Sequence, residues 1–545
     1  MLSIKIYSYA NSPNFLNKES NEDICIFTNT NYFITGESLY FQIQNRNSFS
    51  KIIYVEVINN SLQKVNHQKL YLENGLSKGT MFIGSDFKTG VYKIISYTLQ
   101  SLKQKKKQIS SKDIFIVNPQ DDLNYTFFID NEFQNLKNET LIKENPLKIN
   151  KTNFKKRESI RIDINEIKKM YKDSIFTIKV KPKSIIDEYT KSLITPYKED
   201  ITINIKSNNI ISEIRGEVIS GYLIPKKTNT SLKNIPLSLS ILGKNNSFKI
   251  TSTDEKGNFT FIIDEKIYSK NTIIQCINDN KEDYIIKIDD PITIDYSNFK
   301  FTTPLRVYKN FLPEIKQRYI SAQIDLIYKD FKKDTIIDTD TSLNKFYSPN
   351  YETYQLNEFT QFETIKEIII EIIDGLYISK ESSRTKIKIR DYNNIETISD
   401  ALVIVDDQFV DNIDELLKNK SEVYEKVDIV RGGYVYGGQV FNGIVSFKTK
   451  DNIFESKVNG SYIVNPKIER PIEDRILFFP NYEKNSFERI PDYRSNLYWS
   501  TSDEIINNTI KFFTSDNTGF YTIEIEGIDK NNNHLLIEQS FEVKE

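Results

Sequence analysis

Residues 401–450 read ALVIVDDQFVDNIDELLKNKSEVYEKVDIVRGGYVYGGQVFNGIVSFKTK, and this stretch is the most informative part of the chain. Its pattern predicts a buried strand, the apolar face of a short helix and two further strands separated by glycine turns. In chain order these are Ala401–Val405, then Ile413, Leu416 and Leu417, then Lys426–Arg431 and Phe441–Lys448. The stretch therefore predicts a small α+β module, which we place at residues 391–455.

Three residue pairs set the turns of this module: Arg431–Gly432, Tyr436–Gly437 and Asn442–Gly443. Glycine accepts the backbone conformations that tight turns need, so these positions are explained without a ligand. The order and spacing of the pairs resemble the plug domain of TonB-dependent outer-membrane receptors. That resemblance implies that Arg431 faces an inner barrel wall, yet the residues after 450 are too few to form a barrel. We therefore expect Arg431 to meet a neighbouring domain, a partner or solvent.

Residues 211–300 are predicted to form a small β-sandwich with the turn TDEKGNF at residues 253–259. Gly257 supplies the positive φ that such a turn needs. The pattern resembles the carboxypeptidase regulatory-like domain, which implies a sandwich without catalytic residues. Asp254 and Glu255 raise the alternative of a calcium site, but their spacing does not match an EF-hand loop, and a solvated turn explains them better.

Residues 1–119 show strands at the spacing of an antiparallel sandwich. The strands are YFITGESLYFQ, which is broken at Gly36, then IIYVEVIN, ENGLSKGTMFI and TGVYKIISYT. These stretches resemble the second domain of the alpha-macroglobulin family. A second β-sandwich is expected at residues 120–210, with a weaker similarity to the following macroglobulin-type domain. Together with the modules above, the chain resembles large envelope proteins of Bacteroidetes-type bacteria.

Residues 301–390 are expected to form a helical and irregular connector. A helix is predicted at Leu312–Asp330, and its apolar face consists of Ile315, Tyr319, Ala322 and Leu326. A second helix at Thr364–Asp374 begins with a capping box and ends at Gly375. We expect both apolar faces to pack against the sandwiches; docking of a partner is the alternative.

Residues 456–545 predict a C-terminal β-domain that resembles the terminal sandwich of macroglobulin-type proteins. It contains Trp499, the single tryptophan of the chain. We expect Trp499 to anchor the core of this domain, and a ligand platform is the alternative.

Cysteine and histidine are too rare for most catalytic or metal chemistry. Cys25 and Cys276 are the only cysteines, His67 and His534 are the only histidines, and the net charge is −2. These counts argue against a disulfide framework, a histidine-based triad and a multi-histidine zinc site. Neither cysteine belongs to the Cys-Gly-Glu-Gln run of a macroglobulin thioester. We expect no catalytic residue, no cofactor, no bound metal and no nucleic-acid partner.

The sequence as a whole predicts a mostly β protein: tandem antiparallel β-sandwiches of Ig or macroglobulin-like type, a small α+β plug-like module and two or three helices. No apolar run reaches the roughly 18 residues of a membrane-spanning helix, and no secretory signal is visible at the start. The resemblances imply a non-enzymatic protein of the cell envelope, which acts by protein–protein interaction at the outer membrane, in assembly or as an accessory to a barrel or translocon. The alternatives are a macroglobulin-like protease inhibitor without the thioester and a plug-bearing accessory of TonB-dependent uptake.

Overall fold

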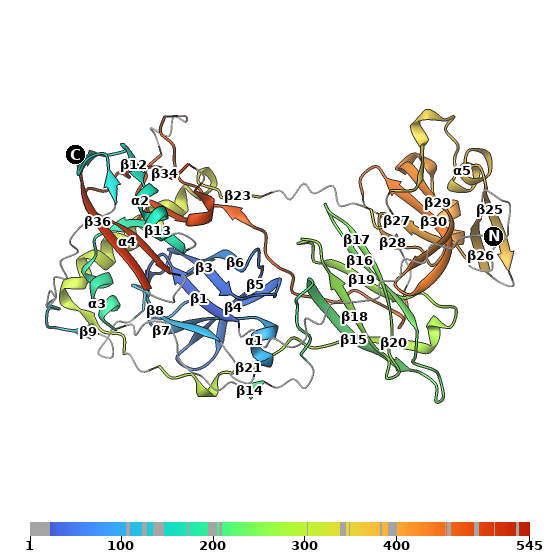
Figure 1. Ribbon diagram of the computed structural model, residues 1–545, viewed down its shortest axis with the longest axis horizontal. Helices are drawn as coiled ribbons and strands as arrows, with labels where there is room; N and C mark the ends of the chain where they lie inside the picture. The colour runs from blue at the N-terminus through green and yellow to red at the C-terminus, as the bar shows by residue number, and fades with distance from the viewer. Residues whose placement is uncertain are drawn as a thin grey trace. The chain divides into compact units, whose positions relative to one another are not determined.

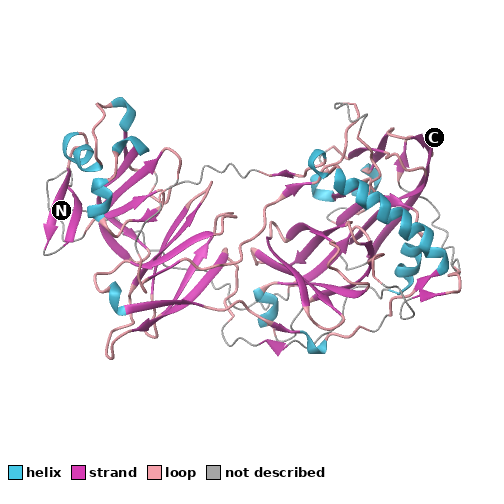
Figure 2. Ribbon diagram, turned by 180° about the vertical axis from the view of Figure 1, so that it is seen from behind, coloured by secondary structure: helices cyan, strands magenta, loops and turns pink. Residues whose placement is uncertain are grey.

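The computed structural model divides the chain into two compact units (Figure 1). Unit 1 consists of Met1–Ile214, Thr293–Ile337 and Glu473–Glu545, and unit 2 consists of Arg215–Ile292 and Asp338–Ile472. Strands predominate in both units (Figure 2), which confirms the mostly β fold class. The structure describes residues 22–104, 109–121, 128–134, 147–171, 174–193, 204–205, 210–301, 304–337, 345–347, 349–381, 384–390, 400–452, 454, 459–483, 490–505, 507–529 and 534–545. Residues 391–399, where we expected the plug-like module to begin, lie outside these ranges.

The first sandwich of unit 1 is built from residues 23–117. Its two sheets have the strand orders β1-β3-β6 and β2-β8-β7-β4-β5. The elements are β1 (Asp23–Thr28), β2 (Tyr32–Ile34), β3 (Ser38–Arg46), β4 (Ile52–Asn59), β5 (Lys64–Tyr71), β6 (Leu76–Phe82), β7 (Gly90–Tyr97), helix α1 (Leu99–Lys103) and β8 (Ser110–Val117). Apolar side chains from both sheets, including Phe41 and Ile94, form one buried cluster.

The second sandwich of unit 1 combines strands from two distant parts of the sequence. Its sheets have the orders β10-β12-β34 and β11-β36-β35-β13-β33. The elements are β10 (Lys148–Ile149), β11 (Asn153–Lys155), β12 (Ser159–Asp163), α2 (Asn165–Met170), β13 (Ile175–Pro182), α3 (Ile185–Leu193), β33 (Tyr498–Thr501), β34 (Thr509–Phe513), β35 (Gly519–Ile528) and β36 (His534–Lys544). Side chains from both parts, such as Ile178 and Ile525, belong to one buried cluster.

This pairing differs from the sequence-based division into separate domains at residues 120–210 and 456–545. In the structure β13 lies between β35 and β33. An alternating apolar pattern shows which face of a strand is buried, but it does not identify the strand that lies beside it. Strands that we assigned to two separate domains from the sequence therefore form one sandwich with a single core.

The remaining elements of unit 1 are helix α4 and three short strand pairs. Helix α4 spans Leu312–Ile327, with Pro313 in its first turn, and its apolar side is buried at Ile315 and Ala322. The predicted helix extended further, to Asp330; in the structure a short 3-10 turn, η4 (Lys329–Phe331), follows it. The strand pairs are β9 (Phe128–Ile129) with β22 (Val307–Tyr308), β14 (Asn204–Ile205) with β21 (Ile294–Asp295), and β23 (Thr335–Ile336) with β32 (Arg475–Ile476).

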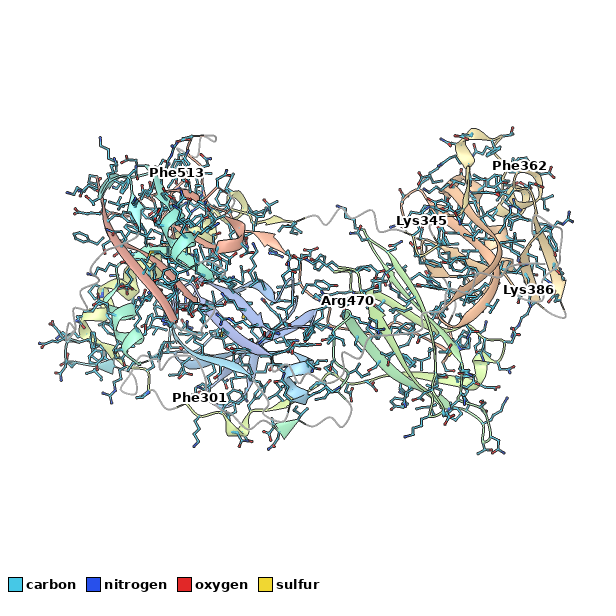
Figure 3. All side chains as sticks on the ribbon, in the orientation of Figure 1. Phe301, Lys345, Phe362, Lys386, Arg470 and Phe513 are labelled. Carbon is cyan, nitrogen blue, oxygen red and sulfur yellow. The ribbon has the colours of Figure 1, made fainter. Side chains whose placement is uncertain are left out.

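The first part of unit 2 is a sandwich that begins at residue 217. Its sheets have the orders β18-β15-β20 and β17-β16-β19-β31. The strands are β15 (Glu217–Pro225), β16 (Pro236–Leu242), β17 (Ser247–Ser252), β18 (Asn258–Ile263), β19 (Asn271–Cys276), β20 (Tyr284–Ile288) and β31 (Ile463–Val464). Arg470, labelled in Figure 3, is buried here and lies 3.0 Å from the carboxylate of Glu217. Residues after the plug-like module thus return to this sandwich.

The plug-like module forms the second part of unit 2. Its main sheet has the strand order β24-β29-β30-β27-β28. Strands β25 and β26, which come between β24 and β27 in the sequence, form a separate hairpin. The elements are β24 (Glu352–Gln355), α5 (Ile365–Glu371), β25 (Leu376–Glu381), β26 (Arg384–Ile389), β27 (Leu402–Val405), β28 (Gln408–Phe409), α6 (Ile413–Lys418), β29 (Tyr424–Tyr436) and β30 (Gln439–Thr449). The capping box predicted for Thr364 and Glu367 is confirmed at the start of α5. Helix α5 belongs to the core of this module rather than to a connector.

Candidate functional site

Unit 1 contains a cavity of about 710 Å³, and we take it as the candidate functional site. Helix α4 and the turn between β2 and β3, which packs against it, form part of the lining. The end of β13 and the start of α3, the segments 478–480 and 492–496, and the turn 517–521 complete it. This volume lies in the range of about 300–1,000 Å³ that is usual for small-molecule and peptide pockets.

Helix α4 contributes a polar stripe to the cavity. Glu314, Arg318, Ser321 and Asp325 all line it. These residues follow one another at helical spacing, so they share one face of the helix. At a rise of 1.5 Å per residue the stripe extends over about 16 Å.

Arg318 is fixed by several hydrogen bonds to the β2–β3 region. Its Nε donates to Oε1 of Glu37 at 2.9 Å, and its Nη2 donates to Oε2 of Glu37 at 2.8 Å and to the carbonyl of Tyr32 at 2.9 Å. Burial lowers the pKa of the Arg318 guanidinium, but the negative charge of Glu37 outweighs this effect and raises the pKa. The arginine therefore stays charged and holds α4 against this edge of the first sandwich.

Three carboxyl groups of the lining differ in their electrostatic surroundings. Burial raises the pKa of Glu314 and of Asp325, although nearby cations act in the opposite direction. Burial also acts to raise the pKa of Asp187, but Lys181, 2.6 Å away, outweighs it, and the pKa of Asp187 is lowered. Within the described residues no group of three or more His, Cys, Asp or Glu side chains is placed to hold a metal ion.

Asp492 and Arg494 add polar atoms to the lining from the segment 492–496. Oδ2 of Asp492 accepts a hydrogen bond from Tyr482 at 2.7 Å and lies 3.0 Å from Nη1 of Arg494. The backbone N–H of Asp492 donates to Asp516 at 2.8 Å. Among the described residues, Oδ1 of Asp492 and Nε of Arg494 have no hydrogen-bond partner. Both atoms have almost no accessible surface, so they are shielded from the cavity.

Two phenylalanines of the lining are exposed to solvent. Phe82 at the end of β6 is 49% exposed, and Phe520 in β35 is 60% exposed. Exposed rings of this size beside a polar cavity provide apolar contact area for a ligand.

Of the glycine and tryptophan positions singled out in the sequence, Gly36 lines this cavity and Trp499 lies beside a lining residue. Gly36 has a φ of +101°, and a Cβ at this position would lie 3.1 Å from Cβ of Ala322 on α4. Gly36 therefore allows helix α4 to approach the β2–β3 turn closely. Trp499 is 3% exposed, and its ring centroid lies 5.9 Å from that of Tyr40, which lines the cavity.

The turn at Asp254 and Gly257 uses the aspartate as a structural acceptor. The carboxylate accepts from the backbone N–H groups of Lys256 and Asn258, each at 2.8 Å, and from the Asn258 side chain at 2.9 Å. The hydrogen bonds from Asn258 lower the pKa of Asp254. Gly257 takes a φ of +85° in this turn. The carboxylate thus stabilises the turn by which the chain passes from β17 in one sheet to β18 in the other.

Arg431 of the plug-like module finds its partners within unit 2. Its Nη2 donates to Glu352 at 3.0 Å and to the carbonyl of Asp374 at 2.7 Å. Gly375, at a φ of +73°, makes room for it, because a Cβ there would lie 2.2 Å from Nη1 of Arg431. The guanidinium therefore joins β29 to β24 and to Asp374 in the turn after α5.

The other motif residues of this module fix its backbone. Gly432 has a φ of +85° and lies where the register of β29 and β30 shifts. Gly443 has a φ of +81°, and a Cβ there would lie 2.1 Å from the carbonyl of Val430. The Asn442 side chain donates to the carbonyl of Ile389 at 3.1 Å. These contacts tie the hairpin of β25 and β26 to β30.

The plug-like module packs on the neighbouring sandwich of unit 2. A shared buried cluster consists of Phe248, Ile250, Tyr347, Leu402, Ile404, Val430 and Ile444. Tyr436 donates from its hydroxyl to the carbonyl of Phe248 at 2.7 Å. Gly437 lies so close that a Cβ would be 2.4 Å from the carbonyl of Ile250. Beside Tyr347 of this cluster, Lys345, labelled in Figure 3, forms an ion pair with Asp428 of β29.

The unit 1 cavity was not predicted from the sequence. One signal for it was present, because Glu314, Arg318, Ser321 and Asp325 form a polar stripe at helical spacing beside the predicted apolar face. No local pattern marks Asp492 and Arg494, because these residues lie far from α4 in the sequence and line the same cavity only in the folded chain.

Comparisons with known proteins give structural neighbours only. No family model matches the chain, and no curated protein matches its sequence. Similar solved structures include Salmonella alpha-2-macroglobulin reacted with methylamine, at 9% identity over 96% of this chain and 23% of that chain, with a TM-score of 0.15. They also include Escherichia coli alpha-2-macroglobulin activated by porcine elastase, at 8% identity over 96% of this chain and 44% of that chain, with a TM-score of 0.21. The chain thus spans less than half of either neighbour, and scores this low assign neither family nor function.

One further finding concerns membranes: none of the helices in the described part of the chain is both long and apolar enough to span a bilayer.

Proposed function

We propose that this protein is a non-enzymatic component of the bacterial cell envelope that acts by binding another protein at the outer membrane, in assembly or as an accessory to a barrel or translocon. The observation that carries the proposal is the contrast between the motif residues of the plug-like module and the residues that line the unit 1 cavity. The motif residues of the plug-like module, with Arg431 as the main example, are engaged in contacts within unit 2. The cavity of unit 1, in contrast, is lined by charged and polar side chains together with the exposed rings of Phe82 and Phe520.

The packing of the plug-like module supports this reading over a role as a separable plug. The face of its sheet that carries Leu402, Val430 and Ile444 is covered by Phe248 and Ile250 of the sandwich. Release of this face into a barrel would expose the whole apolar cluster to water, which is unfavourable by about 25 cal/mol for each Å². We therefore propose that the module acts as part of unit 2.

A macroglobulin-like protease inhibitor is the second candidate, because residues 23–117 form the two-sheet sandwich that the resemblance to macroglobulin domains implies. Covalent capture of a protease by a thioester has no support in the cysteines. Burial raises the pKa of the Cys276 thiol to about 12, and Cys25 is also buried. An inhibitor of this kind would have to hold its protease by non-covalent contacts.

Crosslinking in intact cells tests the proposal. Cells that produce the protein are treated with a lysine-reactive crosslinker, and adducts are identified by mass spectrometry after separation of membranes. The proposal expects a recurrent adduct with one envelope protein in the membrane fraction. A protein recovered without envelope adducts and outside the membrane fraction contradicts it. Incubation of the purified chain with trypsin and elastase tests the second candidate, which requires a single cleavage followed by retention of the protease.

A further inference from the structure

We propose that the two sandwiches of unit 1 part at the seam between them while both cores stay folded, and that this movement widens the cavity. The seam is the contact between the sheet β1-β3-β6 of the first sandwich and the sheet β11-β36-β35-β13-β33 of the second. The movement takes place within unit 1 and requires no envelope partner, so it goes beyond the proposed function.

Each sandwich has a core of its own, and little apolar surface lies in the seam. Ile24 and Ile26 of β1 belong to the core of the first sandwich, whereas Cys25 and Phe27 face the other way, toward Ile528 of β35. Among the described residues, 18 buried apolar side chains form the first core cluster, 20 form the second and three form the cluster in the seam. The free energy of exposing apolar surface grows with its area, so parting of the seam is far less unfavourable than unfolding of either core.

Hydrogen bonds from β3 provide polar contacts across the seam. Gln44 donates from Nε2 to the carbonyl of Ile175 at 2.8 Å. Arg46 donates from Nη2 to the carbonyls of Ile528 at 2.9 Å and of Asp529 at 2.6 Å. Water can take the place of each partner once the sheets part, so each of these bonds adds only a modest preference for the closed state.

Two buried lysines, one from each sandwich, meet at Thr28. Lys112 of β8 donates to Oγ1 of Thr28 at 3.0 Å, and Lys179 of β13 donates to the Thr28 carbonyl at 3.1 Å. Lys179 also pairs with Glu524 and Glu526, at 2.6 and 2.5 Å. Burial lowers the pKa of Lys112 to about 8, so the closed seam disfavours the charged form of this lysine. Hydration of these charges when the seam opens therefore offsets part of the contacts that are lost.

The cavity lies between the parts that move. Its lining includes Tyr40 of the first sandwich, and Pro182 and Phe520 of the second. Helix α4 is joined to the first sandwich by the hydrogen bonds of Arg318 to Glu37. When the sheets part, the two sides of the lining move away from each other, and the cavity widens.

The thiol of Cys25 makes the movement measurable, because it is 3% exposed in the closed seam and reaches solvent when the seam opens. The full chain with Cys276→Ser is treated with iodoacetamide under native conditions, and modification is followed by mass spectrometry. The reference chain carries Cys25→Ser, Cys276→Ser and Val55→Cys, which places its thiol in the core of the first sandwich. Each rate is divided by the rate of the same chain when unfolded. We expect Cys25 to react at least about 10-fold faster than the core thiol, which is exposed only by unfolding.

A seam variant and a matched control test which contacts hold the sandwiches together. Arg46→Met removes the hydrogen bond to the carbonyl of Ile528, so Cys25 should react roughly 10-fold faster. Arg157→Met is the control, because Arg157 is also half-buried and its ion pair with Asp516, at 2.6 Å, lies within the second sandwich. It should leave the rate of Cys25 unchanged.

A core variant separates opening from unfolding. Ile116 belongs to the core of the first sandwich, so Ile116→Val should make the thiol of Val55→Cys react about 2- to 10-fold faster. The open state keeps this core, and the rate of Cys25 should therefore not change.

A staple across the cavity tests the link between the seam and the cavity. Phe82 of the first sandwich and Phe520 of the second are exposed and line the cavity, so Phe82→Cys and Phe520→Cys can be joined by the shortest bis-maleimide that reaches. The staple should abolish most of the native-state reaction of Cys25. The chain with Phe82→Cys alone, treated with the same reagent, should keep its rate.

Four results overturn the proposal. These are equal normalised rates for Cys25 and the thiol of Val55→Cys, no acceleration by Arg46→Met, equal acceleration of both thiols by Ile116→Val, and a staple without effect on Cys25. Far-ultraviolet circular dichroism shows that each variant is folded. Crosslinking to an envelope partner does not depend on these thiols, so the seam movement and the proposed function can fail independently.

Discussion

The buried ion pair of Arg470 and Glu217 is predicted to hold the return segment of unit 2 on its sandwich. Both side chains are 0% exposed, and Nη1 of Arg470 lies 3.0 Å from the carboxylate. Arg470 also donates from Nη2 to the carbonyl of Ile267 at 3.0 Å. The substitution Arg470→Met keeps much of the side-chain volume but removes the cation that lies beside the buried Glu217 carboxylate.

The expected effect is large because a buried charge without its partner is poorly tolerated. Removal of one partner of such a pair destabilises a protein by about 3–5 kcal/mol. For a unit of this size that corresponds to a drop in melting temperature of roughly 6–20 °C. The double variant Glu217→Gln with Arg470→Met has no buried charge, so it should unfold within about 2 kcal/mol of the original protein.

Urea unfolding with two probes measures this difference. Circular dichroism reports strands in both units, whereas the fluorescence of Trp499 reports unit 1, to which the single tryptophan belongs. We expect Arg470→Met to move a circular-dichroism transition to lower urea and to leave the fluorescence transition in place. The reasoning is refuted if Arg470→Met destabilises by less than about 1 kcal/mol, or if the double variant is less stable than the single one.

Four further predictions concern other buried groups. Lys179 lies between two buried glutamates, 2.6 Å from Glu524, so Lys179→Met should destabilise unit 1 by about 3–5 kcal/mol in a urea titration followed by tryptophan fluorescence. Burial acts to raise the pKa of Glu524, but the charge of Lys179 outweighs burial and lowers the pKa. The stability that this gives is present above the usual glutamate range and is lost as pH falls through the lowered pKa. An acid titration should therefore show the loss of stability only at low pH, and a loss already near neutral pH contradicts the prediction. Gly437→Val should separate the plug-like module from the sandwich, because a Cβ at this position lies 2.4 Å from the carbonyl of Ile250. Hydrogen exchange of a peptide that covers β17 should therefore become faster in the variant, and unchanged exchange refutes the contact. Burial raises the pKa of Cys276 to about 12, so iodoacetamide at pH 8 should modify it only after unfolding, and labelling of the folded chain contradicts this.

Local features of the fold were predictable because short-range backbone chemistry determines them. The capping box of Thr364 and Glu367 begins α5 as its sequence indicates. Gly257 and Gly375 adopt the positive φ angles that their turn and helix-end positions require. The strands of the plug-like module likewise follow the apolar runs, as in Leu402–Val405. In each case the determining atoms lie within a few residues of one another.

The partners of functional groups were not predictable in this way. The sequence left the partner of Arg431 open, and in the structure its partners include Glu352, the first residue of β24, where no sequence motif is present. The cavity likewise joins Arg318, Asp492 and Gly36 from three separate parts of the chain. Side chains that meet only after the chain has folded leave no mark at either position in the sequence.

The sequence by itself therefore determined the fold class and the local conformations of this protein: strands from alternating apolar residues, turns from glycine and asparagine, and helix ends from capping residues. The tertiary structure alone decided that β13 pairs with β35 and β33, that the plug-like module packs on Phe248 and Ile250, and that α4 borders a polar cavity. The physical reason is the range of the interactions. Backbone propensities act between neighbouring residues, whereas strand pairing and cavity formation depend on contacts between residues far apart in the chain. The apolar patterns of the strands are similar, so the sequence is compatible with many alternative pairings.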